Sequence, residues 1–298
     1  MNLGFRLFDF LKTTLMLCLG VALFAVGSLV FLQPAKSDVV IQNGQKVVFL
    51  GDSITGFGWA KPAGYVKLVV AGLAANGVTI NPIPAGVGGN TSADMIARLN
   101  ADVVSKQPDW ALVSCGVNDA FPSRNISVSA YESNITQIVD QCQAAHIKVV
   151  IMTPTPIGED WSSDLNVRLG VFNDFLRQLA AQKGCVLADV NAAMVDAIKK
   201  KAKPAYTFTV DSVHMDPGGD FVMAACVLRS FGVTDAGIKT AESQWMDIPD
   251  GVSLAVTVPM TPRQWFMLQD IAASRNQDVP TYLADQSKSA IPAASVSK

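Results

Sequence analysis

Short apolar runs alternate with longer amphipathic stretches over the central part of the chain. The apolar runs are typical of buried parallel strands, and the stretches between them repeat apolar residues at helical spacing. The predicted strands cover residues 46–51, 78–84, 110–115, 148–153 and 185–190. The predicted helices cover residues 62–75, 92–105, 128–145, 165–182 and 217–231.

This alternation predicts an α/β fold in which a doubly wound, five-stranded parallel sheet lies between two layers of helices. If the strand order is 2-1-3-4-5, the first strand lies between the second and the third, and their carboxyl ends form a topological switch point. Ligands bind at such points in open α/β sheets. We therefore expect the chemistry of this chain in the segments that follow these three strands.

Residues 1–37 differ from the rest of the chain. They carry Arg6 and Lys12 and then an uncharged run over residues 13–32, which is long enough to cross a bilayer as a helix. We interpret this region as a signal peptide or transmembrane anchor. The Ala-Lys-Ser at residues 35–37 is a candidate cleavage site, but the length of the apolar run favours an uncleaved anchor.

The α/β pattern stops near residue 237, which predicts one domain over residues 38–237 and a small appendage over residues 238–298. In the appendage we expect a short strand at residues 253–259, two helices that start at Thr261-Pro262 and at Asp278-Val279-Pro280, and a disordered tail over residues 286–298. This order weakly resembles the ribbon-helix-helix family, which pairs two chains and binds DNA. The predicted strand has no basic residue, so a packing or dimerising appendage is favoured.

Three polar segments follow the first three predicted strands, where chemistry is expected, and a fourth lies near the end of the α/β pattern. A serine at a strand-to-helix turn more often only caps the next helix, so Ser53 alone is weak evidence. The inference rests on four segments taken together: Gly51-Asp52-Ser53, Gly88-Gly89-Asn90-Thr91, Gly116-Val117-Asn118-Asp119 and Asp211-Ser212-Val213-His214.

A serine hydroxyl becomes an effective nucleophile only when a neighbouring base removes its proton. The chain has two histidines. His146 lies at the end of a helical stretch, where an imidazole interacts favourably with the helix dipole. His214 lies three residues after Asp211, so that the carboxylate can hold one ring nitrogen while the other faces the serine. The turn signals after His214 favour this interpretation over a surface loop histidine.

Acyl transfer also requires hydrogen-bond donors for the oxyanion of the tetrahedral intermediate. Asn118 and the backbone N–H groups of Ser53 and Gly89 fit this requirement. Gly-x-Asn-Asp is also good turn chemistry, but its place beside the serine strand favours a functional role. Asp52 and Asp119 have no partner in a triad that Asp211 already completes, so we interpret them as turn-stabilising groups.

The four blocks, in this order, resemble the SGNH (GDSL) hydrolase family over about residues 46–233. The resemblance implies a flavodoxin-like strand order and a reaction without a metal or an organic cofactor. The second block departs from the family pattern at Pro84, where an Asn often precedes the first glycine. The roles implied are nucleophile for Ser53, base for His214, orienting carboxylate for Asp211, and oxyanion hole for Ser53, Gly89 and Asn118.

The composition is that of a globular domain behind a membrane-directed leader, with 298 residues, 50% hydrophobic and 16% charged. The net charge of −2 is too close to neutral for a surface that binds nucleic acid or anionic lipid. The cysteines lack the spacing of a metal site, and their places in apolar runs favour buried thiols. Candidates for substrate contact near the predicted site are Asp52, Phe57, Trp59, Phe121 and Trp161.

We therefore expect an exported or membrane-anchored serine esterase that cleaves acyl esters through an acyl-enzyme. Placement outside the cytoplasm favours acetyl groups on polysaccharide or peptidoglycan as the substrate. The alternatives are an acyltransferase that acylates a glycan, a lipase or thioesterase, and a catalytically silent, membrane-tethered binding module. The intact set of four blocks argues against the binding module.

Overall fold

The computed structural model of this chain describes residues 39–201, 207–249 and 258–290. The chain divides into two compact units, Met1–Val252 and Ser253–Lys298. The leader expected over residues 1–37 and most of the strand expected at residues 253–259 lie outside the described residues. Within the described ranges, no helix combines the length and the apolar character needed to cross a bilayer.

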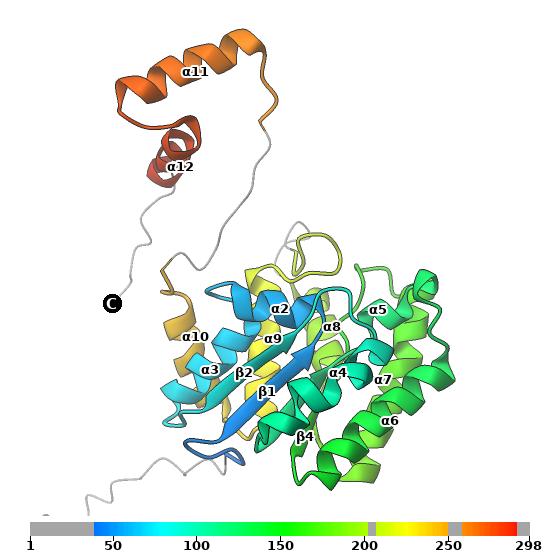
Figure 1. The fold of residues 1–298 in the computed structure, drawn as a ribbon. Coiled ribbons are helices and arrows are strands. Elements are labelled where there is room, and N and C mark those ends of the chain that lie inside the picture. The colour runs from blue at the N-terminus through cyan, green and yellow to red at the C-terminus, as the bar shows by residue number, and fades with distance from the viewer. Residues whose placement is uncertain (1–38, 202–206, 250–257, 291–298) are drawn as a thin grey trace, which may run out of the picture. The chain divides into compact units, whose positions relative to one another are not determined.

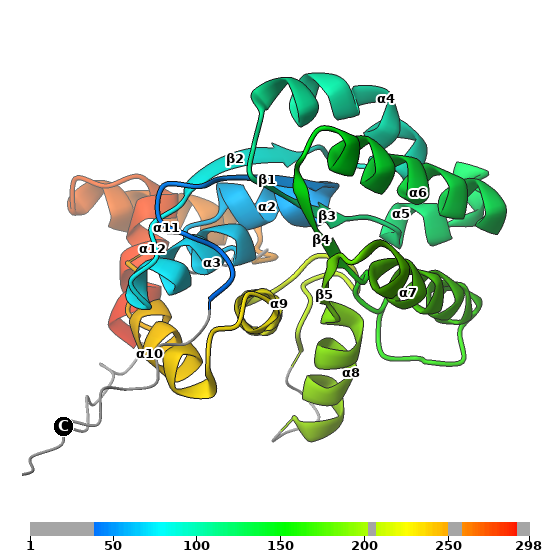
Figure 2. The same cartoon turned by 90° about the horizontal axis from the view of Figure 1, so that it is seen from below.

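The first unit contains a five-stranded parallel sheet in the order β2-β1-β3-β4-β5. Figure 1 shows β1 and β2 side by side, and Figure 2 labels every strand of the sheet. This confirms the doubly wound α/β fold that the alternating pattern predicts and the strand order that the family resemblance implies. Because β1 lies between β2 and β3, the carboxyl ends of these three strands are adjacent. The strands are β1 (Lys46–Gly51), β2 (Asn81–Gly86), β3 (Trp110–Ser114), β4 (Lys148–Met152) and β5 (Val186–Ala188).

Helices cover both faces of the sheet (Figure 2). One layer consists of α2 (Ser53–Ala60), α3 (Tyr65–Ala75), α8 (Val190–Lys200), α9 (Pro217–Ser230) and α10 (Asp235–Trp245). The other contains α4 (Ser92–Asp102), α6 (Val128–Ala144) and α7 (Asp164–Lys183). The short helices are η1 (Val104–Lys106), α5 (Val117–Ala120) and η2 (Pro122–Arg124).

The side chains of β1 are divided between two hydrophobic cores. Val47 and Phe49 belong to the core on the α3 and α9 side, whereas Val48 and Leu50 belong to the core on the α4 and α6 side. All four side chains are fully buried. A strand that is buried on both faces needs a continuous apolar run rather than an alternating one, which is why this run is the clearest strand signal in the sequence.

Strand β2 occupies Asn81–Gly86, somewhat later than the predicted residues 78–84. It contains Pro82 and Pro84, which lack the N–H that a central strand needs. Asn81 donates its N–H to the carbonyl of Gln45, which precedes β1. Backbone N–H groups alternate in direction along a strand, so the nitrogens of the two prolines face away from β1. Because β2 is an edge strand, no donor is missing there.

The helices at α3, α4, α6, α7 and α9 confirm the predicted ones, with small differences at their ends. The pattern did not reveal α2, α5 and α8. Helix α2 contains two glycines, α5 is a single turn, and α8 follows β5 almost directly, where the sequence predicted a longer strand. Asp189 caps α8 and thereby ends the strand early.

Helix α10 was also not predicted, because the α/β pattern stops within it. Thr234 caps this helix, and its apolar side chains Ile238, Ala241 and Trp245 are buried in the first core. The last strand of this unit is β5, and α8, α9 and α10 follow it in succession, so α10 adds core but no strand. The first compact unit therefore runs to Val252 rather than ending near residue 237.

The described part of the second unit contains α11 (Pro262–Ser274) and α12 (Val279–Ala290). Both begin at the predicted cap signals, but α12 continues through residues 286–290, so the prediction of a disordered tail from residue 286 is wrong there. Thr261 and Gln264 form a reciprocal capping box at α11, and the carboxylate of Asp278 accepts a hydrogen bond from the N–H of Thr281 in α12.

Asp220 is a buried carboxylate in the first turn of α9. It accepts a hydrogen bond of 2.9 Å from the N–H of Tyr65, the first residue of α3. Burial raises the pKa of Asp220 to about 7 and outweighs the lowering effects of this hydrogen bond and of Lys61. Asp220 therefore couples the packing of α3 on α9 to pH.

Because the pKa of Asp220 is raised from 3.8 to about 7, its contribution to stability is complete below about pH 4 and is lost as the pH rises through 7. Asp220→Asn keeps an acceptor for Tyr65 but removes the titration. We expect the difference in melting temperature, variant minus wild type, to be larger at pH 8 than at pH 5 by on the order of 5 °C. Thermal unfolding of both proteins at pH 5 and at pH 8 measures this change. The same difference in melting temperature at the two pH values would contradict the prediction.

Candidate active site

Ser53 lies at the point where β1 turns into α2. The carboxylate of Asp52 caps this helix and accepts a hydrogen bond of 2.9 Å from the N–H of Ile54. A Cβ at Gly51 would stand 2.0 Å from Oγ1 of Thr55, so the turn requires glycine. The turn leaves Ser53 half-buried at the carboxyl end of β1, with its backbone N–H at the start of a helix, where donors lack partners within the helix.

Asp211 and His214 lie at the tip of a small hairpin that precedes α9. Its two sides are joined by an isolated antiparallel bridge and by a hydrogen bond of 2.8 Å from the N–H of Val210 to the carbonyl of His214. Ser212, between the two candidate residues, has a φ of 74°. This left-handed conformation reverses the chain, and Oδ1 of Asp211 accepts the N–H groups of Val213 at 3.0 Å and His214 at 2.7 Å.

The structure brings Ser53, His214 and Asp211 into one hydrogen-bonded chain. Oγ of Ser53 lies 2.8 Å from Nε2 of His214. Nδ1 of His214 lies 2.7 Å from Oδ2 of Asp211. A carboxylate accepts the proton on Nδ1, which leaves Nε2 free to accept the hydroxyl proton.

The charge of Asp211 suits this arrangement. Partial burial acts to raise its pKa, but the hydrogen bonds from the side chain and backbone of His214 and from the N–H of Val213 outweigh burial and lower the pKa to about 2. The carboxylate is therefore ionised at neutral pH, where it orients the imidazole and stabilises the imidazolium that forms when the serine loses its proton.

The segments that carry the candidate oxyanion donors meet beside Ser53. An added Cβ at Gly88 would stand 4.0 Å from Cβ of Ser53, so the turn after β2 passes next to Ser53. Gly89 has a φ of 74° in this turn, which favours glycine. Nδ2 of Asn118, in α5, donates to the carbonyl of Asn90 at 3.0 Å.

Asp52 and Asp119 stabilise the chain turns around the site, as expected from their positions. Asp119 is fully buried and accepts hydrogen bonds from both the N–H and the hydroxyl of Ser92, which joins the start of α4 to α5. Burial raises the pKa of Asp119, and it raises that of Asp52 to about 6. Asp52 is only 2% exposed, so it lies beneath the site rather than on a surface that substrate could touch.

Of the four aromatic candidates for substrate contact, Phe57 is the one beside the candidate triad. Its ring meets the imidazole of His214 edge-on, with 5.0 Å between the centroids, and its side chain is 46% exposed. Trp59 and Phe121 are half-buried and pack against the first core. Trp161 is exposed, in the loop between β4 and α7.

The loop that carries Trp161 reaches the hairpin of Asp211. The N–H of Gly158 donates to the carbonyl of Ser212 at 2.8 Å. This contact places the loop between β4 and α7 against the hairpin that carries Asp211 and His214. Gly158 has a φ of 63°, and an added Cβ would contact the side chain of Ser212.

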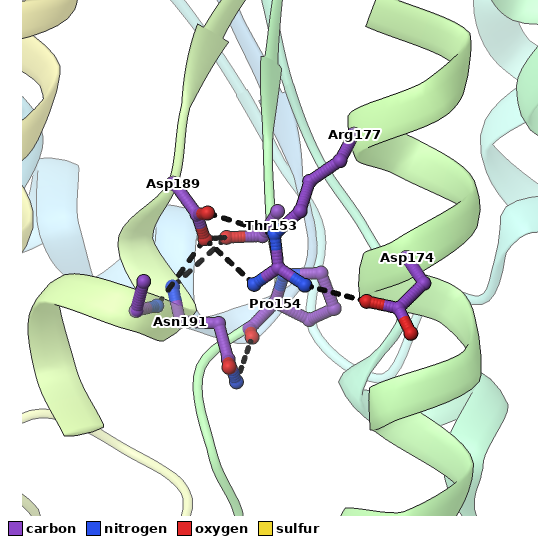
Figure 3. A network of polar contacts seen from close by, with 7 residues as sticks. Thr153, Pro154, Asp174, Arg177, Asp189 and Asn191 are labelled. Carbon is purple, nitrogen blue, oxygen red and sulfur yellow. Dashed lines mark hydrogen bonds and ion pairs between the residues drawn. The ribbon is translucent and has the colours of Figure 1, made fainter.

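A polar network fixes the base of this loop (Figure 3). The carboxylate of Asp189 accepts hydrogen bonds from Nε of Arg177 at 2.8 Å and from the hydroxyl of Thr153 at 2.9 Å. Nδ2 of Asn191 donates to the carbonyl of Pro154 at 3.1 Å. The chain after β4 is thereby tied to α7 and to the start of α8.

Two basic residues that the sequence pattern did not reveal support the site. Nζ of Lys61 donates to the carbonyl of Met215 at 2.9 Å, next to His214. The guanidinium of Arg98 donates to Oδ1 of Asn90 at 2.7 Å. Lys61 and Arg98 lie outside the four polar blocks, and only the folded structure shows which groups their long side chains contact. Within the described ranges, no cluster of His, Cys, Asp or Glu is arranged to hold a metal ion.

A serine, histidine and aspartate in hydrogen-bond contact at the switch point of a doubly wound sheet define a serine hydrolase with an α/β/α fold. The model of the GDSL-like Lipase/Acylhydrolase family matches residues 49–220. This chain belongs to that family, which confirms the SGNH resemblance and the assignment as a serine carboxylic ester hydrolase.

The chain is similar to the acetylxylan esterase of Geobacillus stearothermophilus, with 27% identity over 212 residues that cover 64% of this chain and 96% of that enzyme. The crystal structure of this enzyme, Axe2, matches with a TM-score of 0.59 and 26% identity over 65% of this chain and 97% of Axe2. Catalytic mutants of Axe2 replace a serine, an aspartate and a histidine, and its aspartate and histidine have the same spacing as Asp211 and His214.

Two further similarities support the same family. LAE5, an alpha/beta hydrolase enzyme from the metagenome of Lake Arreo, matches with a TM-score of 0.59 and 26% identity over 65% of this chain and 98% of LAE5. Esterase TesA of Pseudomonas aeruginosa is 28% identical over 109 residues, which cover 36% of this chain and 53% of TesA.

Proposed function

We propose that this chain is an esterase that removes acetyl groups from acetylated polysaccharide, with Ser53 as nucleophile, His214 as general base and Asp211 as orienting carboxylate. The observation that carries the proposal is the hydrogen-bonded chain from Oγ of Ser53 through His214 to Asp211. The match to the acetylxylan esterase of Geobacillus stearothermophilus supports the choice of substrate.

In the first half of the reaction, Oγ of Ser53 attacks the acetyl carbonyl carbon while its proton moves to Nε2 of His214. The N–H groups of Ser53 and Gly89 and the amide of Asn118 stabilise the oxyanion. The intermediate then collapses, the bond between the carbonyl carbon and the sugar oxygen breaks, and this oxygen leaves with the proton from Nε2. The product is acetyl-Ser53 and a free sugar hydroxyl.

In the second half, water replaces the sugar. His214 removes a proton from the water, whose oxygen attacks the acetyl-enzyme carbonyl. The second tetrahedral intermediate uses the same oxyanion donors, and its collapse returns the proton to Oγ of Ser53 and releases acetate. Asp211, ionised because of its lowered pKa, stabilises the imidazolium in both halves.

The openness of the site suits a substituent on a polymer. Ser53 is half-buried and the His214 side chain is 25% exposed, so an ester on a long chain can reach the nucleophile. The exposed ring of Phe57 offers a flat apolar surface beside His214, and the apolar face of a sugar can pack on such a surface. These features favour a glycan ester over a long-chain lipid ester.

We expect the full chain to release acetate from acetylated xylan and to hydrolyse p-nitrophenyl acetate faster than esters with longer acyl chains. Ser53→Ala and His214→Ala each remove one partner of the 2.8 Å contact. Each should lower kcat for p-nitrophenyl acetate by at least about 1000-fold. Measured kcat values for the three proteins, with circular dichroism to check folding, test this prediction.

Different failures of this experiment have different meanings. Folded variants with undiminished activity would exclude the triad. Activity on long-chain esters with none on acetylated glycans would exclude the proposed substrate. A product in which the acetyl group moves to an added glycan acceptor, rather than to water, would identify a transferase.

We also propose that the chain is exported and anchored in the membrane by residues 1–37. The support is the uncharged run over residues 13–32 after Arg6 and Lys12. In cell fractionation, the full chain should sediment with membranes and be cleaved by protease added outside the cytoplasmic membrane. Recovery in the soluble cytosol would contradict the proposal.

We further propose that the second unit pairs two copies of the chain. Trp265, Leu268 and Ala272 share one face of α11, and of these Ala272 is fully buried. Met267 and Ile271 lie on the opposite side together with Phe266, and their exposed fractions are 59%, 43% and 63%. Helices of this length are marginal alone in water, and a helix with apolar residues on both sides needs two packing partners.

Charge favours a second copy as the occupant of this outer face. Arg263 and Asp270 flank Met267 at helical spacing on the same side of α11. If two α11 helices cross antiparallel near Met267, Arg263 of each copy lies near Asp270 of the other. Such a contact would cover the apolar side chains and place opposite charges at both ends.

Met267→Asp should weaken self-association of the full chain by about 30-fold, because it puts a carboxylate at the centre of the contact. Gln269→Asp is the matched control, since it introduces the same residue at an exposed position away from this face. Light scattering over a concentration series in mild detergent measures the effect. A monomeric wild type, or equal losses in both variants, would contradict the pairing.

A further inference from the structure

Arg98 connects α4 to the turns around the nucleophile. Its side chain is 17% exposed, and each nitrogen of its guanidinium donates one hydrogen bond. Nε donates to Oδ1 of Asn90 at 2.7 Å, Nη2 to the carbonyl of Gly51 at 2.9 Å, and Nη1 to the carboxylate of Asp102 at 2.7 Å. Two of these acceptors belong to segments of the candidate active site.

The two inner acceptors relate directly to the oxyanion donors. The first, Gly51, is the last residue of β1, two positions before Ser53. The second, Asn90, follows Gly89, and its backbone carbonyl accepts the amide of Asn118 at 3.0 Å. One guanidinium therefore links the three segments that carry the N–H of Ser53, the N–H of Gly89 and the side-chain amide of Asn118.

The turn that contains Gly89 needs such a link. It has two consecutive glycines, and Gly89 is in the left-handed region with a φ of 74°. Glycine backbones lose the most conformational freedom when they are fixed, and an oxyanion hole is effective only if its donors are already in place when charge develops. A planar, always charged guanidinium can hold two acceptors at a fixed separation, which a lysine ammonium cannot do.

We propose that Arg98 is a positioning residue of the esterase reaction, which sets the geometry of the oxyanion hole through Gly51 and Asn90. This inference rests on the assignment of Gly89 and Asn118 as oxyanion donors. Asp102 pairs with Arg98 from the outer side, through an oxygen on a carboxylate that is 37% exposed. None of the hydrogen bonds described above joins Asp102 to Gly51 or Asn90, so Asp102 is a suitable control position.

The test compares Arg98→Lys with Asp102→Asn in the full chain, with p-nitrophenyl acetate as substrate. Misplaced donors weaken binding of the transition state more than binding of the substrate. Arg98→Lys should therefore lower kcat by about 10- to 100-fold and change KM by less than about twofold. Asp102→Asn, which keeps both inner hydrogen bonds, should retain kcat within about twofold of the wild type.

A double-mutant cycle separates positioning from a general loss of stability. If Arg98 acts through the oxyanion hole, Arg98→Lys should reduce kcat by a much smaller factor in Asn118→Ala than in the wild type, because both substitutions damage the oxyanion hole. Independent effects would multiply. Asn90→Ala supplies a second variant, since it leaves the bond from Arg98 to Gly51 intact, and it should also lower kcat with little change in KM.

The outcomes distinguish this proposal from the function on which it rests. If Asn118→Ala keeps full activity, the assignment of the oxyanion hole is wrong. If Asn118→Ala loses activity while Arg98→Lys and Asn90→Ala keep theirs, Arg98 is not a positioning residue. If Arg98→Lys lowers the melting temperature, and its kcat loss multiplies fully with that of Asn118→Ala, the arginine has only a structural role.

Discussion

Strand β1 is paired on both edges, with β2 from Lys46 to Gly51 and with β3 from Val47 to Gly51. Its side chains are buried in both cores, so the strand cannot shift without breaking two ladders and exposing apolar surface. The position of its carboxyl end is therefore fixed. The serine turn, the glycine turn after β2 and the asparagine turn after β3 all lie at this end, because β1 is the central strand of the three.

His214 and Asp211 reach this edge in another way. They come from a hairpin between the last strand and α9, and no sheet ladder holds them. Instead, local hydrogen bonds hold the hairpin: Val210 to the carbonyl of His214, Gly158 to that of Ser212, and Lys61 to that of Met215. The hairpin with His214 is thus supported by Lys61 at the end of α2 and by Gly158 in the loop after β4, so these contacts also determine how His214 meets Ser53.

The sequence predicted the parts of the fold that depend on hydrophobic periodicity and on the four polar motifs. The apolar runs and the four polar blocks led to the strands and to the residues that meet at the sheet edge, whereas the strand order was implied by the family resemblance. Period alone could not reveal α2, whose glycines are required by close contacts such as that of Gly58 with Tyr65. It could not place Phe57 against His214 or Arg98 against Gly51 and Asn90, because such contacts depend on helix packing between segments distant in sequence.

Three buried carboxylates around the site follow one physical rule. Asp52, Asp119 and Asp220 accept the N–H groups of Ile54, Ser92 and Tyr65, at the starts of α2, α4 and α3. Burial raises the pKa of each carboxyl, yet removing the acceptor would leave a buried helix N–H without a partner, which is also unfavourable. The fold tolerates these carboxylates because they fix the helix starts that surround Ser53. These helix starts are therefore fixed at the expense of stability at higher pH.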